Sequence, residues 1–371
     1  SHYPNFKNKN LVQKDLANTL KIIASEGKKG FYEGEIAEKI SKEITENNGL
    51  ISKSDLKKYN PIWRDPLISN YRDTKVITMG PPSSGGLHVI QMLNILENYD
   101  LNKIGHNSSE YINLLAEVMK YAYADRSKYL GDPDFYEVPI RKIISKEYAN
   151  EISKNIEIGK LRPAKQIHPG KFMRKESHET THFSVVDKQG NVVSMTYTLN
   201  STFGSKVVIE GTGILMNNEM DDFSAAPGVP NQFNLLGAEA NEIAPFKRPL
   251  SSMTPTIVLK NDELFFTTGS PGGARIISAV LQSILNIIDF NMNLEDTTLA
   301  KRIHHQWYPD ILEYEFTLDK NIEDDLKKIG YKTSSKLPLT SLQTIMFADG
   351  IYYGYGDFRR VDALASGKIY D

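Results

Sequence analysis

Residues 180–200 read TTHFSVVDKQGNVVSMTYTLN, two runs rich in β-branched and aromatic residues on either side of a polar turn. Asp187 stands at the first position of this turn and Gly190 at the fourth, which favours a type I turn followed by a left-handed glycine. The resulting three-residue loop would bring Thr198 opposite Thr180. A two-residue loop would shift the pairing by one residue, so both registers stay open. In either case the stretch predicts a β-hairpin.

The chain before this hairpin is predicted to be mostly helical. Residues 111–130 have the strongest pattern, with apolar side chains at helical spacing and Gly131 after them as a stop signal. From about Lys160 to Glu179 the apolar periodicity disappears, and polar residues and prolines predominate. Segments of this kind are exposed places where a chain is commonly cut.

The chain after the hairpin is predicted to contain further strands and a long helix. The β-rich runs 256–260 and 264–268 lead into GSPGG (269–273), and a helical pattern follows. A glycine-rich connection from strand to helix is most often only a tight turn. The alternative is that the backbone N–H groups of Gly272 and Gly273 face an anion at the start of the helix.

The bulk composition excludes several classes of function. With 371 residues, 40% of them hydrophobic, the chain can bury one large core or two ordinary ones. The net charge of −2 does not indicate nucleic acid or an anionic membrane as a partner. The chain has no cysteine, which excludes disulfides, thiolate metal sites and a cysteine nucleophile. We expect no membrane-spanning segment, because no apolar run approaches ~20 residues, and the first residues do not resemble a signal peptide.

Common catalytic patterns are missing from the sequence. There is no nucleophile elbow, zinc-binding helix, phosphate-binding loop or dinucleotide fingerprint, and neither a metal nor a cofactor is predicted. The acidic residues Glu219, Asp221 and Asp222 are typical of a loop or a helix cap, but they could also hold an ammonium group. Ser251 and Ser252, taken alone, are typical of turns and caps.

The order of these motifs, however, resembles that of the γ-glutamyltranspeptidase family. The run that begins at Thr180 is similar to the start of that family's small subunit. The resemblance continues in TYTLN (196–200), NNEMDDFS (217–224), RPLSSM (248–253), GSPGG (269–273), HHQW (304–307) and GDFRR (356–360). Upstream, PSSGG (82–86) and YADRS (123–127) are similar to the C-terminal half of the large subunit.

This resemblance implies an α+β fold of the Ntn-hydrolase type. In such a four-layer αββα sandwich, two stacked and mainly antiparallel sheets lie between helix layers. The resemblance also implies a precursor that cuts itself between Glu179 and Thr180. Residues 1–179 would then be the C-terminal part of the large subunit and residues 180–371 the small subunit. Both parts would form one structural domain and remain together as a heterodimer of the two cleavage products.

The resemblance also implies a role for each motif residue. Thr180 would be the nucleophile, and its freed α-amine, with an ordinary pKa of about 7.7–8.0, would be the general base for its own hydroxyl. Thr198 would hydrogen-bond that hydroxyl, and the N–H groups of Gly272 and Gly273 would bind the oxyanion. The α-amino-acid head of the substrate would be bound by Asn200, Glu219, Asp222, Ser251 and Ser252.

The substrates and the location follow from the same resemblance. A γ-glutamyl group from glutathione, glutamine or a related amide would be transferred to water or to an acceptor amino acid or peptide. The expected location is the periplasm or the outside of the cell. Two other reactions on this scaffold, poly-γ-glutamate cleavage and cephalosporin-acylase-like hydrolysis, are the nearest alternatives, and a catalytically inert fragment is a third.

The sequence departs from the family pattern in two places. In the lid segment at residues 228–233, Phe233 stands where relatives often carry Tyr or Trp, so it can pack but cannot donate a hydroxyl. The family's arginine that binds the substrate α-carboxylate is expected in a segment upstream of this chain. If the carboxylate is instead held from within the chain, Arg248 and Arg275 are the predicted candidates.

Overall fold

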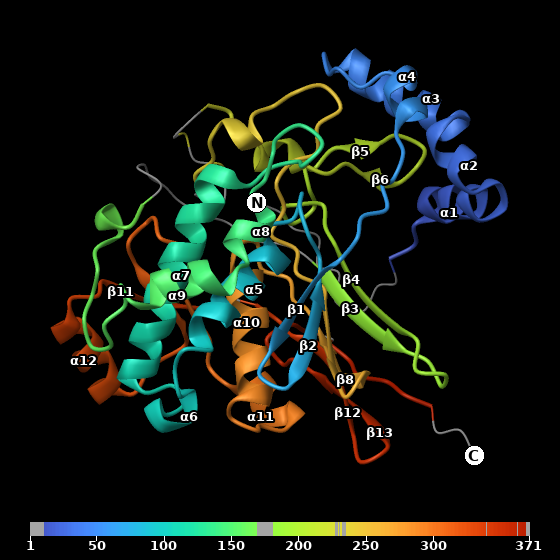
Figure 1. Ribbon diagram of the computed structural model, residues 1–371. Helices are drawn as coiled ribbons and strands as arrows, with labels where there is room; N and C mark the ends of the chain where they lie inside the picture. The colour runs from blue at the N-terminus through green and yellow to red at the C-terminus, as the bar shows by residue number, and fades with distance from the viewer. Residues whose placement is uncertain are drawn as a thin grey trace. The chain divides into compact units, whose positions relative to one another are not determined.

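The computed structural model of the protein describes residues 11–168, 181–226, 229, 231, 235–338, 340–361 and 363–368. The chain divides into two compact units, with element labels as in Figure 1. Unit 1 is Ser1–Arg64 with Phe203–Asn218, and unit 2 is Asp65–Thr202 with Glu219–Asp371. All described residues that the sequence assigns to the site belong to unit 2.

Unit 1 is a helical unit with a short hairpin. Its core contains Ile36 and Ile40, one turn apart on α3, packed with Ile209 of the hairpin. The Thr19 hydroxyl donates to the Thr212 carbonyl at 2.9 Å and so joins the first helix to the hairpin turn. The elements of unit 1 are α1 (Lys14–Glu26), α2 (Lys28–Tyr32), α3 (Glu35–Glu46), α4 (Lys53–Lys58), β5 (Val208–Ile209) and β6 (Ile214–Leu215).

Unit 2 is built on a six-stranded sheet with the order β1-β2-β7-β8-β12-β13. Each neighbouring pair is antiparallel. Strands from both sides of the predicted cleavage site share this sheet, because β2 pairs with β7 from Thr74↔Lys260 to Thr78↔Thr256. The strands are β1 (Leu67–Tyr71), β2 (Thr74–Thr78), β7 (Thr256–Lys260), β8 (Glu263–Thr268), β12 (Gln343–Ala348) and β13 (Ile351–Gly356).

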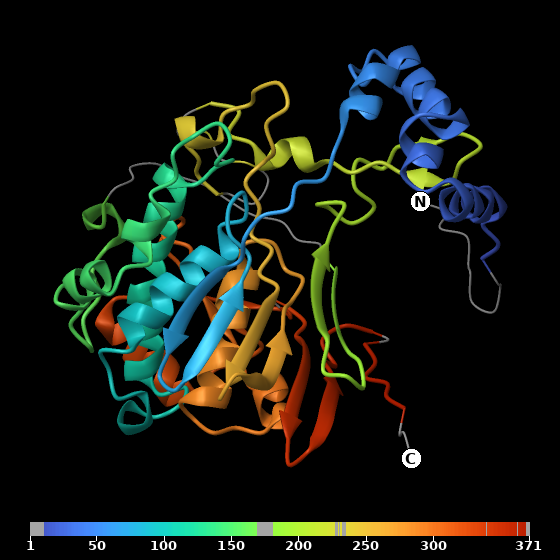
Figure 2. The ribbon, with the colours of Figure 1, turned by 45° about the vertical axis from the view of Figure 1, so that its right-hand side comes forward.

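Helices cover one face of this sheet, and a β-hairpin lies over the other (Figures 1 and 2). Helix α5 (Gly85–Leu96) is buried along its whole length, including its polar residues His88, Gln91 and Asn94. Helix α7 (Ser109–Tyr129) begins at Ser108, whose hydroxyl accepts the Tyr111 N–H at 3.1 Å. With α10 (Arg275–Ile288) these helices bury the main core.

Shorter elements complete unit 2. A three-stranded sheet has the order β11-β10-β9. The remaining elements are α6 (Leu101–Ile104), α8 (Ile140–Ile143), α9 (Lys146–Ser153), η1 (Ala164–Gln166), η2 (Glu219–Asp222), η3 (Glu239–Asn241), α11 (Leu294–Leu299), β9 (Ile303–His304), β10 (Leu312–Glu315), α12 (Lys320–Ile329) and β11 (Thr333–Lys336). No helix within the described ranges is long and apolar enough to cross a bilayer.

The hairpin of β3 (Thr181–Val186) and β4 (Val192–Tyr197) has the register that the three-residue loop predicts. The Asp187 N–H donates to the Asn191 carbonyl at 3.0 Å, and Gly190 has a φ of 82°. The three-residue loop is therefore confirmed over the described residues. Thr180 lies outside them, so its pairing with Thr198 stays a prediction.

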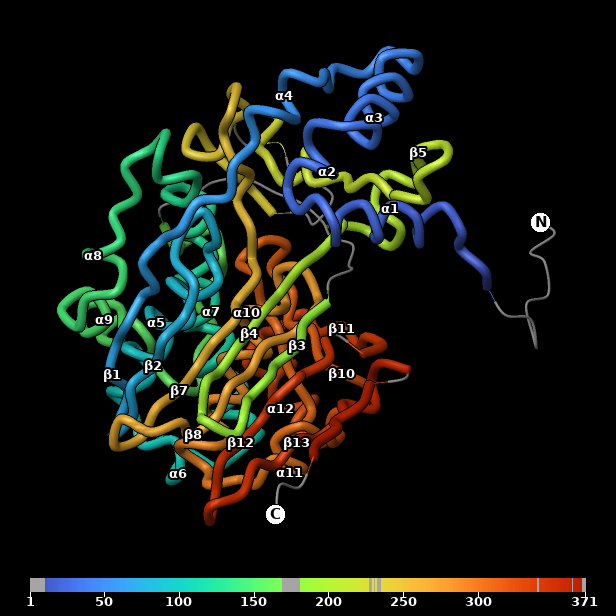
Figure 3. The backbone as a smooth tube through the Cα atoms, turned by 90° about the vertical axis from the view of Figure 1, so that its right-hand side faces the viewer, coloured from blue at the N-terminus to red at the C-terminus, as the bar shows by residue number. Residues whose placement is uncertain are grey.

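The two faces of this hairpin differ in polarity. Toward the large sheet, the Ser184 hydroxyl donates to the Gln343 carbonyl at 3.1 Å and the Ser194 hydroxyl to the Thr268 carbonyl at 3.3 Å. The opposite face carries exposed apolar side chains, namely Phe183, Val185, Val193, Met195 and Tyr197. Figure 3 shows the hairpin lying across the strands of the large sheet. The α+β class is thus confirmed, and the two-stranded antiparallel sheet β3-β4 lies on the six-stranded antiparallel sheet.

Candidate active site

One narrow pocket in unit 2 gathers most of the residues that the sequence assigns to the site. Its free volume is about 30 Å³. It is lined by Arg126, Thr198, Asn200, Asp222, Leu235, Leu250, Ser251, Ser252, Met253, Gly273, Ala274 and Ile276. Residues from before and after the predicted cleavage site therefore face the same space.

The serine side of the pocket consists of Ser251 and Ser252 and is held by the PPSSGG loop at residues 81–86. The Ser251 N–H donates to the Pro82 carbonyl at 2.9 Å, and the Ser84 N–H donates to the Ser251 carbonyl at 2.8 Å. The hydroxyl of Ser84 donates to that same carbonyl at 2.8 Å. The loop thus adds a short backbone pairing to the serine segment and fixes its path.

Position 85 of this loop has no room for a side chain, so the loop needs a glycine there. A Cβ atom at this position would lie 2.1 Å from the Thr254 hydroxyl oxygen, 2.7 Å from the Met253 carbonyl oxygen and 2.8 Å from the Ser252 carbonyl oxygen. Any side chain would therefore push the serine segment away from the loop. In the sequence this loop is marked only by the family resemblance, and no role in the site was predicted for it.

Arg126 is the basic residue among the described pocket residues, and it was not predicted as a site residue. It lies in the last turn of α7 and is 4% exposed. Its Nε donates to the Ser84 hydroxyl at 2.9 Å and its Nη2 to the Ser252 hydroxyl at 3.1 Å. A guanidinium stays charged in proteins, so the serine side contains a permanent positive charge.

Neither arginine that was predicted as a candidate lines this pocket. Arg275 forms an ion pair with Glu313, with 2.8 Å between its Nε and the Glu313 Oε2. The backbone N–H of Arg248 donates to the Asp132 carboxylate at 2.8 Å. Among the residues that line the pocket, the arginine is Arg126 and not one of these two candidates.

The acidic side of the pocket is the short helix η2, which carries Glu219 and Asp222. The two carboxyl groups hydrogen-bond to each other. Burial raises the pKa of Glu219 to about 7. Burial, together with the neighbouring Glu219, raises the pKa of Asp222 well above its usual range, and the Arg126 charge opposes this rise. Two carboxyl groups with raised pKa values are suited to receive a cation.

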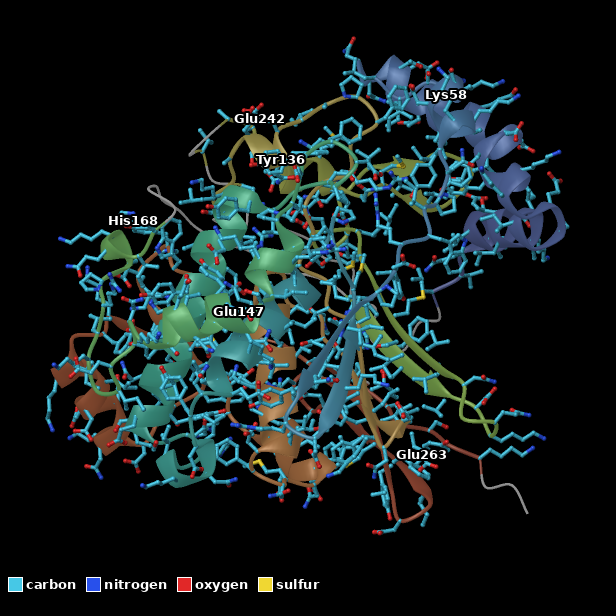
Figure 4. The ribbon with its side chains drawn as sticks, viewed as in Figure 1. Lys58, Tyr136, Glu147, His168, Glu242 and Glu263 are labelled. Atoms are coloured by element: carbon cyan, nitrogen blue, oxygen red, sulfur yellow. The ribbon has the colours of Figure 1, made fainter. Side chains whose placement is uncertain are left out.

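Asn241 connects the acidic side to the serine side. Its Nδ2 donates to the Asp222 carbonyl at 2.7 Å, and its Oδ1 accepts the Leu250 N–H at 3.0 Å, one residue before Ser251. A bridge between Ser224 and Glu242, which is labelled in Figure 4, lies beside it. Asn241 is 4% exposed, so its amide replaces water for both backbone groups. No sequence signal distinguishes it from other loop asparagines.

Thr198 and Asn200 line the pocket at the end of β4. The Asn200 N–H donates to the Thr198 hydroxyl at 2.8 Å, and Asn200 has a φ of 73°, an uncommon conformation for a residue with a side chain. Asn200 is 3% exposed. The predicted nucleophile Thr180, its neighbour Glu179 and the lid residue Phe233 all lie outside the described residues.

The glycine-rich connection after β8 brings Gly273 to the pocket. Gly272 has a φ of 136° and Gly273 a φ of 56°, conformations that favour glycine. No described residue accepts the Gly273 N–H. Because α10 begins two residues later, this N–H lies near the positive end of the helix dipole. The arrangement suits a developing negative charge.

His182 is buried beside this connection and has a packing role. Its Nδ1 lies 2.8 Å from the Thr196 hydroxyl oxygen, and burial lowers its pKa to about 4, so the ring is neutral at physiological pH. A Cβ at Gly269 would lie 2.2 Å from the ring. The ring therefore occupies the space above the first glycine of the connection. In the described part of the chain, no cluster of three His, Asp or Glu residues could hold a metal ion.

The chain is similar to known proteins over almost its whole length. A model of the gamma-glutamyltranspeptidase family matches residues 5–367. The glutathione hydrolase proenzyme of Escherichia coli (strain K12) is 50% identical over 97% of this chain and 62% of its own length. The enzyme with the same description from Pseudomonas sp. (strain A14) is 42% identical over 96% of this chain and 64% of its own length.

A solved structure is also similar. The crystal structure of cephalosporin acylase from Bacillus halodurans has a TM-score of 0.82 and 28% identity, covering 94% of this chain and 61% of that one. The chain spans less than two thirds of the length of these curated relatives and of this neighbour.

Proposed function

The chain belongs to the γ-glutamyltranspeptidase family, and on that premise we propose that it forms the catalytic part of an autoprocessed γ-glutamyltransferase and hydrolase. The observation that carries this proposal is the pocket, whose lining includes a serine pair with an arginine and the carboxyl group of Asp222, which interacts with Glu219. Such a pair of charges suits an α-amino-acid head, which has an ammonium and a carboxylate on one carbon.

Processing would create the nucleophile. Cleavage between Glu179 and Thr180 would convert an amide nitrogen, which cannot accept a proton, into an α-amine with an ordinary pKa of about 7.7–8.0. That amine would take the proton of the Thr180 hydroxyl as the oxygen attacks the γ-glutamyl carbonyl. The amine leaving group would depart with a proton and leave an acyl-threonine ester. Water or an acceptor amine would then release the γ-glutamyl group.

The pocket would serve each stage of this reaction. Thr198 would hydrogen-bond the Thr180 hydroxyl, and the N–H groups of Gly272 and Gly273 would stabilise the oxyanion, where one donor is worth about 2.7–4 kcal/mol. Glu219 and Asp222 would bind the substrate ammonium, while Asn200, Ser251 and Ser252 would position the rest of the head. Phe233 would cover the site.

Glutathione, glutamine and related γ-glutamyl amides are the proposed donors, and amino acids or peptides the proposed acceptors. The two relatives described as glutathione hydrolase proenzymes support this choice. We also propose that the two cleavage products remain a heterodimer and that the protein works in the periplasm or outside the cell. The shared sheet supports the first of these proposals, because β2 and β7 come from different products.

A cephalosporin-acylase-like activity is the second candidate, since a solved acylase has a similar fold. A glutaryl side chain, however, ends in a carboxylate and has no ammonium group. Asp222 and Glu219 would repel that carboxylate whenever they are ionised. The acidic side therefore favours the γ-glutamyl head.

The direct test is to replace Thr180 with Ala in the complete protein. The unchanged protein should give two bands on a denaturing gel and a new N-terminus at Thr180, and it should hydrolyse a γ-glutamyl anilide. Thr180→Ala should remain one uncut chain without activity. Cleavage after Glu179 in that variant would show that Thr180 does not drive processing. If the unchanged protein preferred a glutaryl anilide to the γ-glutamyl anilide, the result would favour a cephalosporin-acylase-like activity.

A further inference from the structure

We propose that Arg126 is a positioning residue that turns the Ser252 hydroxyl into a hydrogen-bond donor for the substrate α-carboxylate. This inference rests on the function proposed above and names a determinant of specificity at the same site. It assigns the recognition of a free α-carboxylate to a side chain from the part of the chain before the cleavage site.

The first support is that the hydroxyls of four neighbouring serines form hydrogen bonds in two different ways. The hydroxyls of Ser83 and Ser84 donate to backbone carbonyls of the serine segment, at 2.6 Å and 2.8 Å respectively. The hydroxyls of Ser251 and Ser252 instead accept, from the Met253 N–H at 3.1 Å and from Arg126 at 3.1 Å. The first two hydroxyls thus hold the loop, and the last two face the pocket.

A hydroxyl has one hydrogen and two lone pairs, so a bond accepted from a cation decides where its hydrogen can point. Arg126 occupies the acceptor side of the Ser252 oxygen and repels the hydroxyl hydrogen. No described residue accepts a hydrogen bond from this hydroxyl. The hydrogen of Ser252 is therefore directed to the pocket, where an incoming carboxylate oxygen can accept it.

The position of Arg126 is fixed by its surroundings. Its Nε is bound to Ser84, whose own hydroxyl hydrogen is donated to the Ser251 carbonyl. The guanidinium is almost fully buried, so its field is weakly screened by water. Its charge also acts on Asp222 across the pocket. A ligand with a carboxylate beside Ser252 would face the positive charge of Arg126, and its ammonium would face the carboxyl group of Asp222.

The test compares two substrates that differ only at the α-carbon, a γ-glutamyl anilide and its α-carboxamide analogue. In the complete, processed protein we expect the free carboxylate to be preferred. Arg126→Met should raise KM for the carboxylate substrate by about 10- to 100-fold, the loss typical of a hydrogen bond to a charged group. It should change KM for the carboxamide substrate by about threefold or less, so that the preference for the free carboxylate is lost. Arg126→Lys, which keeps the charge, should restore part of it.

Arg275→Met is the matched control, because Arg275 is also 4% exposed and its guanidinium pairs with Glu313. It should leave the preference between the two substrates unchanged. Ser252→Ala should lower the preference as Arg126→Met does, and the double variant should lose little more.

Each outcome decides the question. If Arg126→Met slows both substrates equally, Arg126 has only a structural role and the inference is wrong. If that variant is not processed, Arg126→Lys and Ser252→Ala carry the test, and an unchanged preference in both would overturn the inference. If the unchanged protein cleaves neither substrate, the proposed function itself fails.

Discussion

The two sides of the pocket are built in different ways. The serine side is held by a backbone pairing with residues 82–84, by the close approach of Gly85 and by a permanently charged guanidinium. The acidic side is one short helical turn whose two carboxyl groups are bound to each other and have raised pKa values. One side is fixed by packing, and the other changes charge near neutral pH.

This difference separates the two tasks of recognition. The serine side sets the geometry of the ligand and does not depend on pH, since arginine does not titrate in this range. The acidic side supplies the charge that selects an ammonium, and that charge appears only when the carboxyl groups lose protons. Substitutions on the two sides should therefore have different kinetic signatures.

The largest expected effect is on the acidic side. Asp222→Ala removes a charge-assisted hydrogen bond of about 1.5–3 kcal/mol, which corresponds to a rise in KM of about 10- to 150-fold. We expect kcat for a γ-glutamyl anilide to change far less, because the reacting atoms lie at the other end of the substrate. The neighbouring exposed Asp221 provides the control, and Asp221→Ala should leave KM within about twofold. An unchanged KM with a collapsed kcat in Asp222→Ala would assign Asp222 to chemistry instead.

The second expected effect is on the pH dependence of binding. Because burial raises the pKa of Glu219 to about 7, this carboxyl group is largely protonated below pH 7 and gains its negative charge above it. The inhibition constant of L-glutamate should therefore improve as pH rises, by up to about tenfold per unit below pH 7. Glu219→Gln should bind L-glutamate more weakly but with a flatter pH profile. If the pH profile of that variant were equally steep, Glu219 would not be the group that causes the pH dependence of binding.

The pKa of Glu219 also affects stability, with a definite sign. Its folded-state pKa lies above the ordinary value of 4.5, so the folded state holds the proton more tightly than the unfolded state. The contribution of this group to the free energy of unfolding is full below pH 4.5 and declines as pH rises to about 7.

The smallest expected effect on activity comes from the packing of the serine side. Gly85→Ala should force the loop and the serine segment apart and lower the free energy of unfolding by about 1–3 kcal/mol. We expect KM to rise by a few-fold with little change in its pH dependence. Gly367→Ala is the control, because nothing lies within 4 Å of its added Cβ. A melting temperature equal to that of the control would contradict the proposed close contact.

The sequence predicted the hairpin well because its information is local. The turn residues favour a three-residue loop over the alternative two-residue loop, and the structure has the register of the three-residue loop from Thr181↔Tyr197 to Val186↔Val192. The resemblance then identified Ser251, Ser252, Asp222 and Gly273 without any knowledge of distances. The pocket brings these together.

The residues that the sequence analysis missed act through contacts far apart in the chain. Arg126 lies 126 positions before Ser252, and Asn241 makes its bonds through main-chain groups of other residues. Neither periodicity nor spacing can report such a contact. Arg126 is one of several buried charged residues of α7, with Glu117, Lys120 and Asp125. It becomes distinctive only after the helix has been placed against the pocket.

The pairing of β2 with β7 has a consequence for the protein once it is cut. The ladder from Thr74↔Lys260 to Thr78↔Thr256 would then join two separate polypeptides. Unfolding would release two molecules, and recovery of the fold would require them to collide, so it would depend on protein concentration. An uncut precursor can refold as a single molecule at any dilution. In a dilute compartment, the lifetime of the mature protein would thus be set by how slowly this ladder opens, and a molecule that opened once would be lost.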